Sequence, residues 1–422
     1  MSNFVIAGGG ISGLAAALGI ARHGHRVDVL ERNGAFAELG AGIQLAPNAF
    51  AALDRLGVGA DVRSTAVHID DLRLMDALSG SVLAALPLGA EYRKRFGNPY
   101  AVVHRGDLYA PLLRACREHP GIRLRADSTV AGFENAGASV HCLLASGERI
   151  EADGLIGADG IRSAVRRQLL GDGDPRVSGH TIHRAVVPME SVPRALRWNS
   201  VTLWAGPGWH LVHYPIAGGT TLNLAIVRDD GATTAVSGLP VRREHVLESY
   251  AEVRGTPRDL LELGRDWRTW VLCDRDPVRR WAEGRTVLIG DAAHPMLQYA
   301  AQGACLALED AVVLGDLLDC ATEEVAGRFA RFTAVRRERT GRAQDTARWM
   351  GEALYHPAGE AAEARNSLLA PLTTPDLLDA VAWLHTARMD TSPERDGGAE
   401  AGASGDRPGQ AVSGGGSRPR RT

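Results

Sequence analysis

A glycine-rich turn near the N-terminus constrains the fold of this chain more than any other feature. Residues 4–7 (FVIA) read as a short buried strand, and a G-x-G-x-x-G pattern, Gly8 to Gly13, follows them directly. A helix rich in Ala and Leu comes next, and a second strand over residues 26–30 leads to Glu31. This order of strand, glycine turn, helix, strand and acid is typical of a βαβ unit that binds a dinucleotide. We therefore predict an α/β fold that opens with a Rossmann-like unit.

Each residue of this unit has a physical reason to be there. Gly8 permits the tight turn after the strand, Gly10 lets the backbone approach a pyrophosphate, and Gly13 lets the helix pack closely on the strand. Glu31 is placed to accept a hydrogen bond from a ribose hydroxyl, which favours a plain adenosine ribose over one that carries a 2′-phosphate. The unit therefore predicts FAD or NAD and does not separate the two.

Composition and charge exclude several other classes of protein. The chain of 422 residues carries 47 Lys and Arg against 50 Asp and Glu, so its net charge of -3 offers no basic field for nucleic acid or anionic lipid. Its five cysteines form no C-x-x-C pair that would suggest zinc or redox chemistry. No basic leader precedes residues 4–7, and no run approaches the roughly 18 apolar residues of a membrane span. We expect a cytoplasmic protein that binds neither nucleic acid nor membrane.

Two further junctions combine glycine and aspartate at the end of a strand-like run. They are residues 154–163 (GLIGADGIRS) and residues 287–295 (VLIGDAAHP). An Asp at the carboxyl end of a strand is well placed to bind a sugar-like polyol, because strand ends open onto the crevice of an α/β sheet. A helix that begins near Gly303 and Ala304 would direct its positive end at the same crevice and stabilise negative charge on a reduced flavin. The later junctions therefore favour FAD.

The three motifs together resemble those of the class A flavoprotein aromatic hydroxylases, which are single-component FAD monooxygenases. The set comprises the N-terminal G-x-G-x-x-G, a central D-G at residues 159–160 and a late G-D at residues 290–291, followed by His294 and Pro295. The match extends from residue 1 to about residue 348. It implies a para-hydroxybenzoate hydroxylase-like α/β fold, in which a Rossmann-like FAD-binding domain carries an inserted β-sheet substrate domain and C-terminal helices.

The resemblance also implies the cofactors and the reaction. FAD is the bound cofactor, NADH or NADPH reduces it during a transient encounter, and O2 reaches the substrate as a flavin C4a-hydroperoxide. The chain has no second G-x-G-x-x-G, so no separate nicotinamide domain is indicated. The resemblance also implies which residues bind the cofactor. At the adenosine end these are Gly8, Gly10, Ser12 and Gly13 for the pyrophosphate, and Glu31 and Arg32 for the adenosine ribose. At the flavin end they are Gln44 and Arg105 for the ribityl and phosphate groups, Asp291 for the ribityl chain, and Pro295, Gly303 and Ala304 beside the isoalloxazine, while Asp159 and Arg162 lie near both FAD and the nicotinamide donor. An alternative for Arg105 is a surface ion pair with Asp107.

The order of segments predicts the domain organisation. Residues 176–227 consist of short β-rich runs between Gly and Pro turns, whereas the chain reads as a run of helices toward its C-terminal end. We therefore divide it into the first part of the FAD-binding domain (1–175), a β-rich substrate domain (176–275), and the completion of the FAD-binding domain with C-terminal helices (276–390). Residues 391–422 have too few apolar side chains to offset the entropy of ordering, and we predict a disordered tail.

A substrate pocket is predicted on the β-rich segment. His210 and Tyr214 are separated by an even number of positions along a probable strand, so they share one face while His213 lies on the other. A phenolic substrate needs a base to remove its proton, and an imidazole with a pKa near neutrality suits that role. The alternative for His210 is an ordinary sheet histidine. Residues 210–215 (HLVHYP) and 295–299 (PMLQY) resemble the salicylate hydroxylase and 3-hydroxybenzoate 6-hydroxylase branch of the family.

In that branch the residues that match His210, Tyr214 and Gln298 line the aromatic pocket, and the resemblance assigns them as catalytic. His210 would withdraw the phenolic proton while Tyr214 and Gln298 orient the ring. The predicted function is the hydroxylation of a small phenolic acid, of the salicylate or 3-hydroxybenzoate type, by a monomer or homodimer. No metal is predicted, because the histidine pairs at 180/183 and 210/213 lack a third ligand, and side chains three positions apart on a strand point to opposite faces.

Other functions are compatible with the same motifs. An amino-hydroxybenzoate hydroxylase of a secondary-metabolite pathway would keep all of them. A flavin-dependent halogenase shares much of the fold, but its W-x-W-x-I-P pattern is absent from this sequence, and a non-oxygenating FAD-binding reductase would need no pocket histidine. The sequence leaves open the exact acid, the position hydroxylated, the loss of carboxylate, the choice between NADH and NADPH, and the role of the tail.

Overall fold

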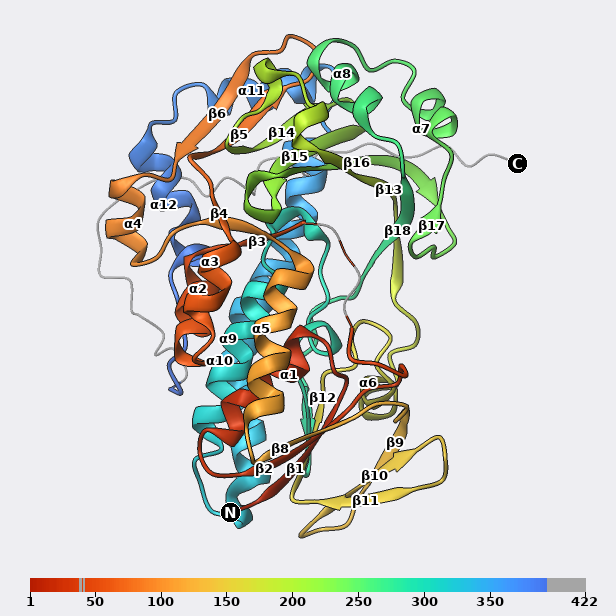
Figure 1. Ribbon diagram of the computed structural model, residues 1–422, viewed down its shortest axis with the longest axis vertical. Coiled ribbons are helices and arrows are strands. Elements are labelled where there is room, and N and C mark those ends of the chain that lie inside the picture. The colour runs from red at the N-terminus through yellow and green to blue at the C-terminus, as the bar shows by residue number, and fades with distance from the viewer. Residues whose placement is uncertain (38–39, 41, 393–422) are drawn as a thin grey trace, which may run out of the picture.

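The computed structural model describes residues 1–37, 40 and 42–392, and shows two large sheets connected by long helices (Figure 1). Within this part of the chain, the sheet drawn lower in Figure 1 has six strands in the order β19-β20-β12-β1-β2-β8. They are β1 (Asn3–Ala7), β2 (Arg26–Leu30), β8 (Ile122–Arg125), β12 (Gly154–Gly157), β19 (Ala282–Glu283) and β20 (Thr286–Leu288). The strands from β20 to β8 pair in parallel, and β19 pairs antiparallel with β20. The predicted βαβ unit is confirmed as β1, helix α1 (Ile11–Ala21) and β2.

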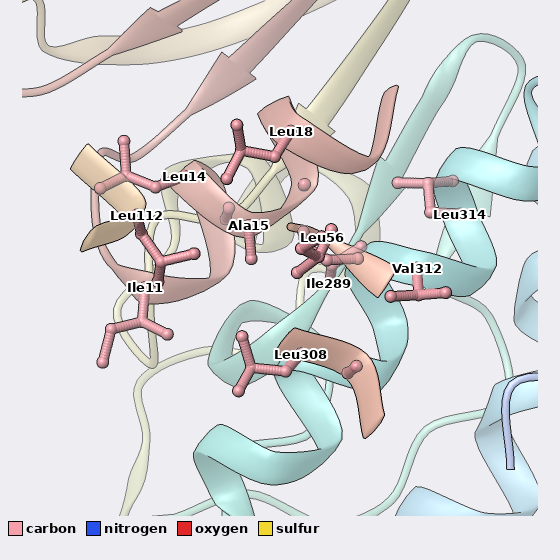
Figure 2. Close-up of a cluster of buried hydrophobic side chains, with 14 of the residues drawn as sticks. Ile11, Leu14, Ala15, Leu18, Leu56, Leu112, Ile289, Leu308, Val312 and Leu314 are labelled. Atoms are coloured by element: carbon pink, nitrogen blue, oxygen red, sulfur yellow. The ribbon is translucent and has the colours of Figure 1, made fainter. Parts of the chain in front are cut away.

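Helices α1 and α9 (Gly303–Leu317) pack against each other through two glycines. A Cβ atom on Gly19 would lie 2.3 Å from the carbonyl oxygen of Ala311, and one on Gly315 would lie 2.2 Å from that of Gly19. Only glycine permits backbones to approach this closely. Figure 2 shows the buried apolar cluster around this contact, which includes Ile11, Leu14, Ala15, Leu18, Leu308, Val312 and Leu314. This contact fixes the position of α1 relative to α9, and the first turns of these two helices belong to the candidate site described below.

The upper sheet of Figure 1 consists of eight of the described strands, in the order β17-β18-β13-β16-β15-β14-β5-β6. Six come from the predicted substrate segment, namely β13 (Arg176–Pro188), β14 (Ser200–Gly206), β15 (Trp209–Ile216), β16 (Thr221–Ala232), β17 (Leu239–Pro240) and β18 (Arg268–Asp274). The other two, β5 (Asp71–Asp76) and β6 (Val82–Pro87), come from the first part of the chain, and β5 pairs in parallel with β14. The inserted segment therefore does not build this sheet alone, because an earlier hairpin completes its edge.

Both faces of the upper sheet are covered. The outer face buries Leu211 and Leu224 together with apolar side chains of α7 (Arg243–Ser249) and α8 (Gly255–Leu263). The inner face buries Ala225 and Val227 together with side chains of α9 and α10 (Val325–Trp349). The inner face is therefore the one that looks toward the lower sheet and its helices.

Two small sheets and several helices complete the described fold. The small sheets are β3 (Gly42–Leu45), β7 (Ala101–His104) and β4 (Val67–His68), and β9 (Val130–Asn135), β10 (Val140–Leu144) and β11 (Arg149–Ala152). The remaining helices are α2 (Pro47–Arg55), α3 (Gly59–Thr65), α4 (Ala90–Phe96), α5 (Arg105–Glu118), α6 (Ala164–Leu170), α11 (Glu360–Leu369) and α12 (Thr374–His385). The run of helices predicted toward the C-terminus is confirmed as α9 to α12. The predicted tail lies, from residue 393 onward, outside the described residues.

No helix in the described part of the chain combines the length and the apolar character needed to cross a membrane.

Candidate active site

The three glycine-rich junctions meet at one edge of the lower sheet. Gly8, after β1, has a φ of +106°, and a Cβ atom there would lie 2.4 Å from the carbonyl oxygen of Ala158, at the end of β12. Gly290, after β20, has a φ of +54°, and its Cβ would lie 2.3 Å from the hydroxyl oxygen of Ser12. Positive φ and contacts this short both require glycine. The carboxyl ends of β1, β12 and β20 therefore form one edge, and this is where ligands bind to open α/β sheets.

The first junction fits a dinucleotide. A Cβ atom on Gly10 would have no described atom within 4 Å, so the backbone here faces open space. Helix α1 starts at the next residue with no capping side chain, which leaves N–H groups of its first turn available for a pyrophosphate. Glu31 stabilises the turn, because its carboxylate accepts hydrogen bonds from the backbone N–H groups of Gly9 at 3.0 Å and Asn33 at 2.9 Å. Arg32 is exposed beside it.

The late junction places a carboxylate beside the start of a second helix. Asp291 is exposed, and its carboxylate oxygen would lie 3.9 Å from a Cβ atom on Gly303. Gly303 and Ala304, the first residues of α9, are half-buried, while Pro295 is buried. A carboxylate suited to polyol hydroxyls and a helix N-terminus suited to negative charge thus lie together, which fits the ribityl chain and isoalloxazine of FAD.

Buried charges anchor this late junction. Asp310 of α9 accepts hydrogen bonds from the backbone N–H of Gly290 at 3.0 Å, from His294 Nε2 at 2.6 Å and from Arg336 Nε at 2.8 Å. Arg336 of α10 also pairs with Glu309 at 2.8 Å. Burial disfavours the charged carboxylate, but His294 and Arg336 outweigh burial and lower the pKa of Asp310 to about 2. These ion pairs therefore fix the G-D turn relative to α9 and α10.

The central Asp159 shapes its own junction. Its carboxylate accepts a hydrogen bond from the backbone N–H of Ala164 at 2.7 Å and another from the hydroxyl of Ser163, so it caps the start of α6. Burial raises the pKa of Asp159. Arg162, in the same turn, is exposed. The contacts of Asp159 and Arg162 with FAD and the nicotinamide donor stay predictions.

Two other predicted flavin contacts belong to the small sheet of β3, β7 and β4. Gln44 lies on β3, and its side-chain oxygen accepts a hydrogen bond from the Tyr100 hydroxyl at 2.5 Å. Arg105 is the first residue of α5 and directly follows β7. Strand β3 also touches the upper sheet, because a Cβ atom on Gly42 would lie 2.4 Å from a ring carbon of Tyr214. This small sheet therefore connects the glycine junctions with the inner face.

The inner face brings His210 and Tyr214 to the same side, as their spacing predicts. His210 is buried, its Nδ1 atom lies 2.8 Å from Nε2 of His356, and its ring centre lies 5.1 Å from that of Tyr299. Burial, with a contribution from His356, holds the pKa of His210 well below its usual value, so the imidazole is neutral. Burial raises the pKa of Tyr214 to about 12, so this phenol keeps its proton.

Gln298 joins this group through an arginine that the sequence did not single out. Arg184 of β13 donates a hydrogen bond from Nη2 to the side-chain oxygen of Gln298, which begins a 3-10 turn shortly before α9. The guanidinium also lies 5.4 Å from the centre of the Trp270 ring. His210, Tyr214 and Gln298 therefore lie on the inner face or on the turn above it, and Arg184 links that turn to the sheet.

Sequence reasoning missed Arg184 and His356. Arg184 is two positions from the buried Ile182 on β13, so the period of a strand could have assigned both side chains to the same, inner face. His356 is 146 residues from His210 and follows a π-helical turn, and no local pattern marks it as a pocket residue. Contacts between segments this far apart carry no signature in either segment.

The histidine pair considered for a metal is split between the two faces. His180 Nδ1 lies 2.6 Å from the Tyr299 hydroxyl on the inner side, whereas the His183 ring contacts the Tyr250 ring, with centres 6.0 Å apart, on the outer side. His213 likewise points outward, and its ring centre lies 5.7 Å from that of Trp198. Side chains three positions apart on these strands therefore diverge, as strand geometry requires.

Comparison with known sequences gives one consistent answer. A family model described as FAD binding domain matches residues 1–350. A protein named 3-hydroxybenzoate 6-hydroxylase 1, from Aquipseudomonas alcaligenes, is 45% identical over 91% of this chain and 97% of its own length. A 3-hydroxybenzoate 6-hydroxylase from Klebsiella oxytoca is 42% identical over 92% of this chain and 98% of that protein. A 3-amino-4-hydroxybenzoate 2-monooxygenase, PtnB3 from Streptomyces platensis, is 35% identical over 90% and 94% of the two chains.

Comparison with solved structures supports the fold. A salicylate hydroxylase in complex with its substrate superposes with a TM-score of 0.79 at 24% identity, covering 92% of this chain and 96% of that one. Klebsiella pneumoniae HpxO, complexed with FAD and uric acid, gives a TM-score of 0.79 at 24% identity over 91% and 97% of the chains. The para-hydroxybenzoate hydroxylase-like α/β architecture expected from the sequence is therefore confirmed.

Proposed function

The chain belongs to the FAD binding domain family and is an FAD-dependent monooxygenase of phenolic aromatic acids, and we propose that it hydroxylates 3-hydroxybenzoate at ring position 6. The observation that carries the proposal is the 45% identity, over 97% of its length, with a protein named for that reaction. The placement of His210, Tyr214 and Gln298 around one sheet face supports it. An imidazole, a phenol and an amide suit a substrate that carries one ionisable hydroxyl.

The described residues fit FAD at the glycine junctions. The backbone between Gly10 and Gly13 would hold the pyrophosphate, Glu31 the adenosine ribose, Asp291 the ribityl chain and the start of α9 the isoalloxazine. When bound and reduced by NADH or NADPH, FAD supplies activated oxygen for insertion into the aromatic ring. The chain itself has to bind and orient the acid, exclude water and move one proton.

His210 is the group that takes the phenolic proton. Burial lowers the pKa of His210, so the imidazole is neutral and can accept a proton, although it is a weaker base than the near-neutral imidazole expected from the sequence. Its Nδ1 atom contacts His356 Nε2 at 2.8 Å, so the substrate hydroxyl meets the other ring nitrogen, Nε2. His356, which is half-buried, orients the His210 ring through this contact. Loss of the phenolic proton raises electron density para to the hydroxyl, which is position 6 of the substrate.

Tyr214 and Gln298 orient the ring. The pKa of Tyr214, raised by burial to about 12, keeps this phenol a hydrogen-bond donor at neutral pH. The side-chain oxygen of Gln298 is engaged by Arg184, so its NH2 group is the part that donates to the substrate. Two donors and one base hold the ring in a single pose, which brings one carbon to the flavin.

A second candidate substrate is 3-amino-4-hydroxybenzoate. A relative named as a 2-monooxygenase of that acid is 35% identical over 90% of this chain, and the lower identity ranks it behind 3-hydroxybenzoate. The relatives named above are all hydroxylases or monooxygenases, so the halogenase and reductase alternatives are not taken further.

The proposal also includes five more detailed predictions made from the sequence. These are the domain division at residues 176 and 276, transient NADH or NADPH binding beside Asp159 and Arg162, O2 as the oxidant, a monomer or homodimer, and a cytoplasmic location. Each of them stays a prediction.

Oxygen uptake by the purified, yellow holoenzyme tests the proposed function. With NADH or NADPH, we expect each 3-hydroxybenzoate to consume one O2 and yield 2,5-dihydroxybenzoate, oxidised nicotinamide and water. Salicylate, 4-hydroxybenzoate and 3-amino-4-hydroxybenzoate are the comparison substrates. Faster coupled turnover of one of these acids would replace the substrate assignment, and a colourless protein without flavin would overturn the whole proposal.

A further inference from the structure

Arg184 is an enclosed arginine whose charge meets no carboxylate of the described residues. Its Nε atom is inaccessible and has no hydrogen-bond partner, and its Nη2 atom meets the neutral side-chain oxygen of Gln298. The titratable groups that act on it are the phenol of Tyr214 and a second cation, Arg105. The described residues therefore offer no negative charge to balance the guanidinium of Arg184.

Other enclosed arginines of the described chain meet carboxylates or, in the case of Arg285, the backbone carbonyls of Gly137, Asp153 and Thr322. Arg166 lies 2.6 Å from Asp172, Arg275 lies 3.2 Å from the same carboxylate, and Arg336 lies 2.8 Å from Glu309. A charge taken out of water costs free energy unless it is paired, which is why such pairs form. Compared with these arginines, Arg184 lacks a partner for its charge, and an anionic ligand would supply one.

Small and apolar residues stand beside Arg184 in the sheet. Arg184 is half-buried, and desolvation lowers the pKa of its guanidinium. Its neighbour on β16 is the small Ala225, and the next residue across, on β15, is Val212. The residue that faces Arg184 on β16 thus has a side chain of only one methyl group.

The register of the sheet sets Arg184 midway between the two predicted pocket residues. Val212 is two residues from both His210 and Tyr214, so the Arg184 row is about 7 Å from each of theirs along the strands. Two strand spacings, about 10 Å, separate the backbones of Arg184 and Val212. Arg184 therefore lies on the same face as His210 and Tyr214, in the row between theirs, and the charge of its guanidinium acts on the phenol of Tyr214.

We propose that Arg184 binds the carboxylate of the aromatic substrate and so determines the preference for acids over neutral phenols. This inference rests on the proposed function and deepens it. A guanidinium offers parallel N–H donors that match a carboxylate, and such charge-assisted pairs are about twice as strong as neutral hydrogen bonds. With the carboxylate on Arg184 and the hydroxyl on His210, the acid lies across the inner face. Gln298, held by Arg184, then donates to the bound ring substituent.

Ligand binding to the holoenzyme tests the assignment without turnover. Benzoate keeps the carboxylate and lacks the hydroxyl, while 3-hydroxybenzyl alcohol keeps the hydroxyl and is neutral, and flavin absorbance reports the binding of each. We expect Arg184→Gln to weaken benzoate binding about tenfold to a hundredfold and the alcohol by less than about threefold, with Arg184→Lys between wild type and Arg184→Gln. Arg268→Gln is the matched control, because Arg268 pairs with Arg184 in the register but is exposed. It should bind both ligands as wild type does.

Thermal unfolding separates ligand binding from a structural role. If the charge lacks a counterion, Arg184→Gln leaves the Tm of the substrate-free holoenzyme unchanged or raises it, and removes the increase in Tm that benzoate gives to wild type. A lower Tm in the substrate-free variant, together with equal losses of affinity for benzoate and the alcohol, would identify a structural arginine and overturn the proposal.

The assignment of Arg184 and the proposed function can fail separately. If wild type converts 3-hydroxybenzoate and Arg184→Gln binds benzoate as tightly as wild type, the carboxylate-binding role is wrong and the function stands. If benzoate binding depends on Arg184 but 3-hydroxybenzoate is not converted, the substrate is wrong and the role of Arg184 stands.

Discussion

Two groups of side chains inside the protein differ in whether their charges meet an opposite charge. The α9 charge cluster comprises His294, Glu309, Asp310 and Arg336, and its ion pairs span 2.6 to 2.8 Å. It joins the late glycine junction to α9 and α10 through hydrogen bonds to backbone and side chain. In this cluster each charge has its counter-charge within the fold.

The inner-face group, which comprises Arg184, His210, Tyr214 and Gln298, is satisfied only in part. Arg184 has an unpartnered Nε and meets no described carboxylate, and His210 is a neutral imidazole tied to His356 through one nitrogen. Since an unpaired charge inside a protein costs stability, we attribute this group to ligand binding rather than to the stability of the fold. Mutations in the α9 charge cluster should therefore lower the stability of the protein, whereas mutations in the inner-face group should lower ligand binding or activity.

The largest effect is expected from Asp310→Asn in the α9 charge cluster. The substitution removes the carboxylate that accepts hydrogen bonds from Gly290 and Arg336, which then keeps only the carboxylate of Glu309, and loss of one partner of a buried pair costs about 3–5 kcal/mol of unfolding free energy. Denaturant unfolding measures the loss. Asp379→Asn is the control, since the exposed pair of Asp379 with Arg95 at 2.5 Å is worth at most about 1 kcal/mol. Equal stability of the two variants would remove the distinction between the groups.

The next effect is on catalysis. His210→Ala removes the proposed base, and we expect kcat for 3-hydroxybenzoate to fall at least about a hundredfold, with less product formed per NADH. His213→Ala is the matched control, because this buried histidine lies on the same strand but on the outer face. It should keep kcat within about threefold of wild type, even though the removal of a buried ring lowers its Tm. A similar fall in kcat in both variants would mean that His210 supports the sheet and is not the base.

A smaller effect is expected on FAD binding at the first glycine junction, where binding can be changed without a change in stability. Gly10→Ala adds a methyl group where no described atom lies within 4 Å, so the apoprotein should keep its stability while FAD binds at least about tenfold more weakly. Gly327→Ala, at an exposed position of helix α10 where a Cβ atom would be equally free of neighbours, is the control and should bind FAD as wild type does. Flavin fluorescence titration of the apoproteins gives both affinities. Wild-type affinity in Gly10→Ala would place the pyrophosphate elsewhere.

The smallest effects are two separate pH dependences of stability. The pKa of Asp310 is lowered to about 2 in the fold, so its contribution is present above about pH 4 and is lost as the pH falls toward 2. The pKa of His356 is lowered by burial to about 4, so the unfolded chain takes up the proton first, and stability falls as the pH drops from about 6.5 to 4.

Unfolding free energies measured from pH 7 to pH 2.5 resolve these two ranges. Asp310→Asn should reduce the change of unfolding free energy with pH in the lower range, and His356→Asn should reduce it in the upper range. A slope that is unchanged by its own substitution would assign that range to another group.

Much of the fold follows from local sequence, whereas the completed site does not. The turn from Gly8 to Gly13 lies between a strand and a helix, so one short segment contains everything that specifies the βαβ unit. The common face of His210 and Tyr214 likewise follows from the period of a strand. The contact between Arg184 and Gln298, however, joins positions 114 residues apart, and it exists only once β13 and the turn before α9 have packed together.

The upper sheet shows the same limit. Strands β5 and β6 read as part of the first segment, yet β5 pairs with β14, whose edge offers backbone groups for pairing, and β6 pairs with β5. A division based on order along the chain cannot anticipate a strand that crosses between segments.

The most direct test of the central claim is the fate of oxygen during turnover of 3-hydroxybenzoate. Under 18O2, with the yellow holoenzyme and NADH or NADPH, mass spectrometry should find 2,5-dihydroxybenzoate carrying one 18O atom, formed in step with the nicotinamide oxidised. A product whose new hydroxyl carries oxygen from water, or nicotinamide oxidation that yields only hydrogen peroxide at saturating 3-hydroxybenzoate, would contradict the account.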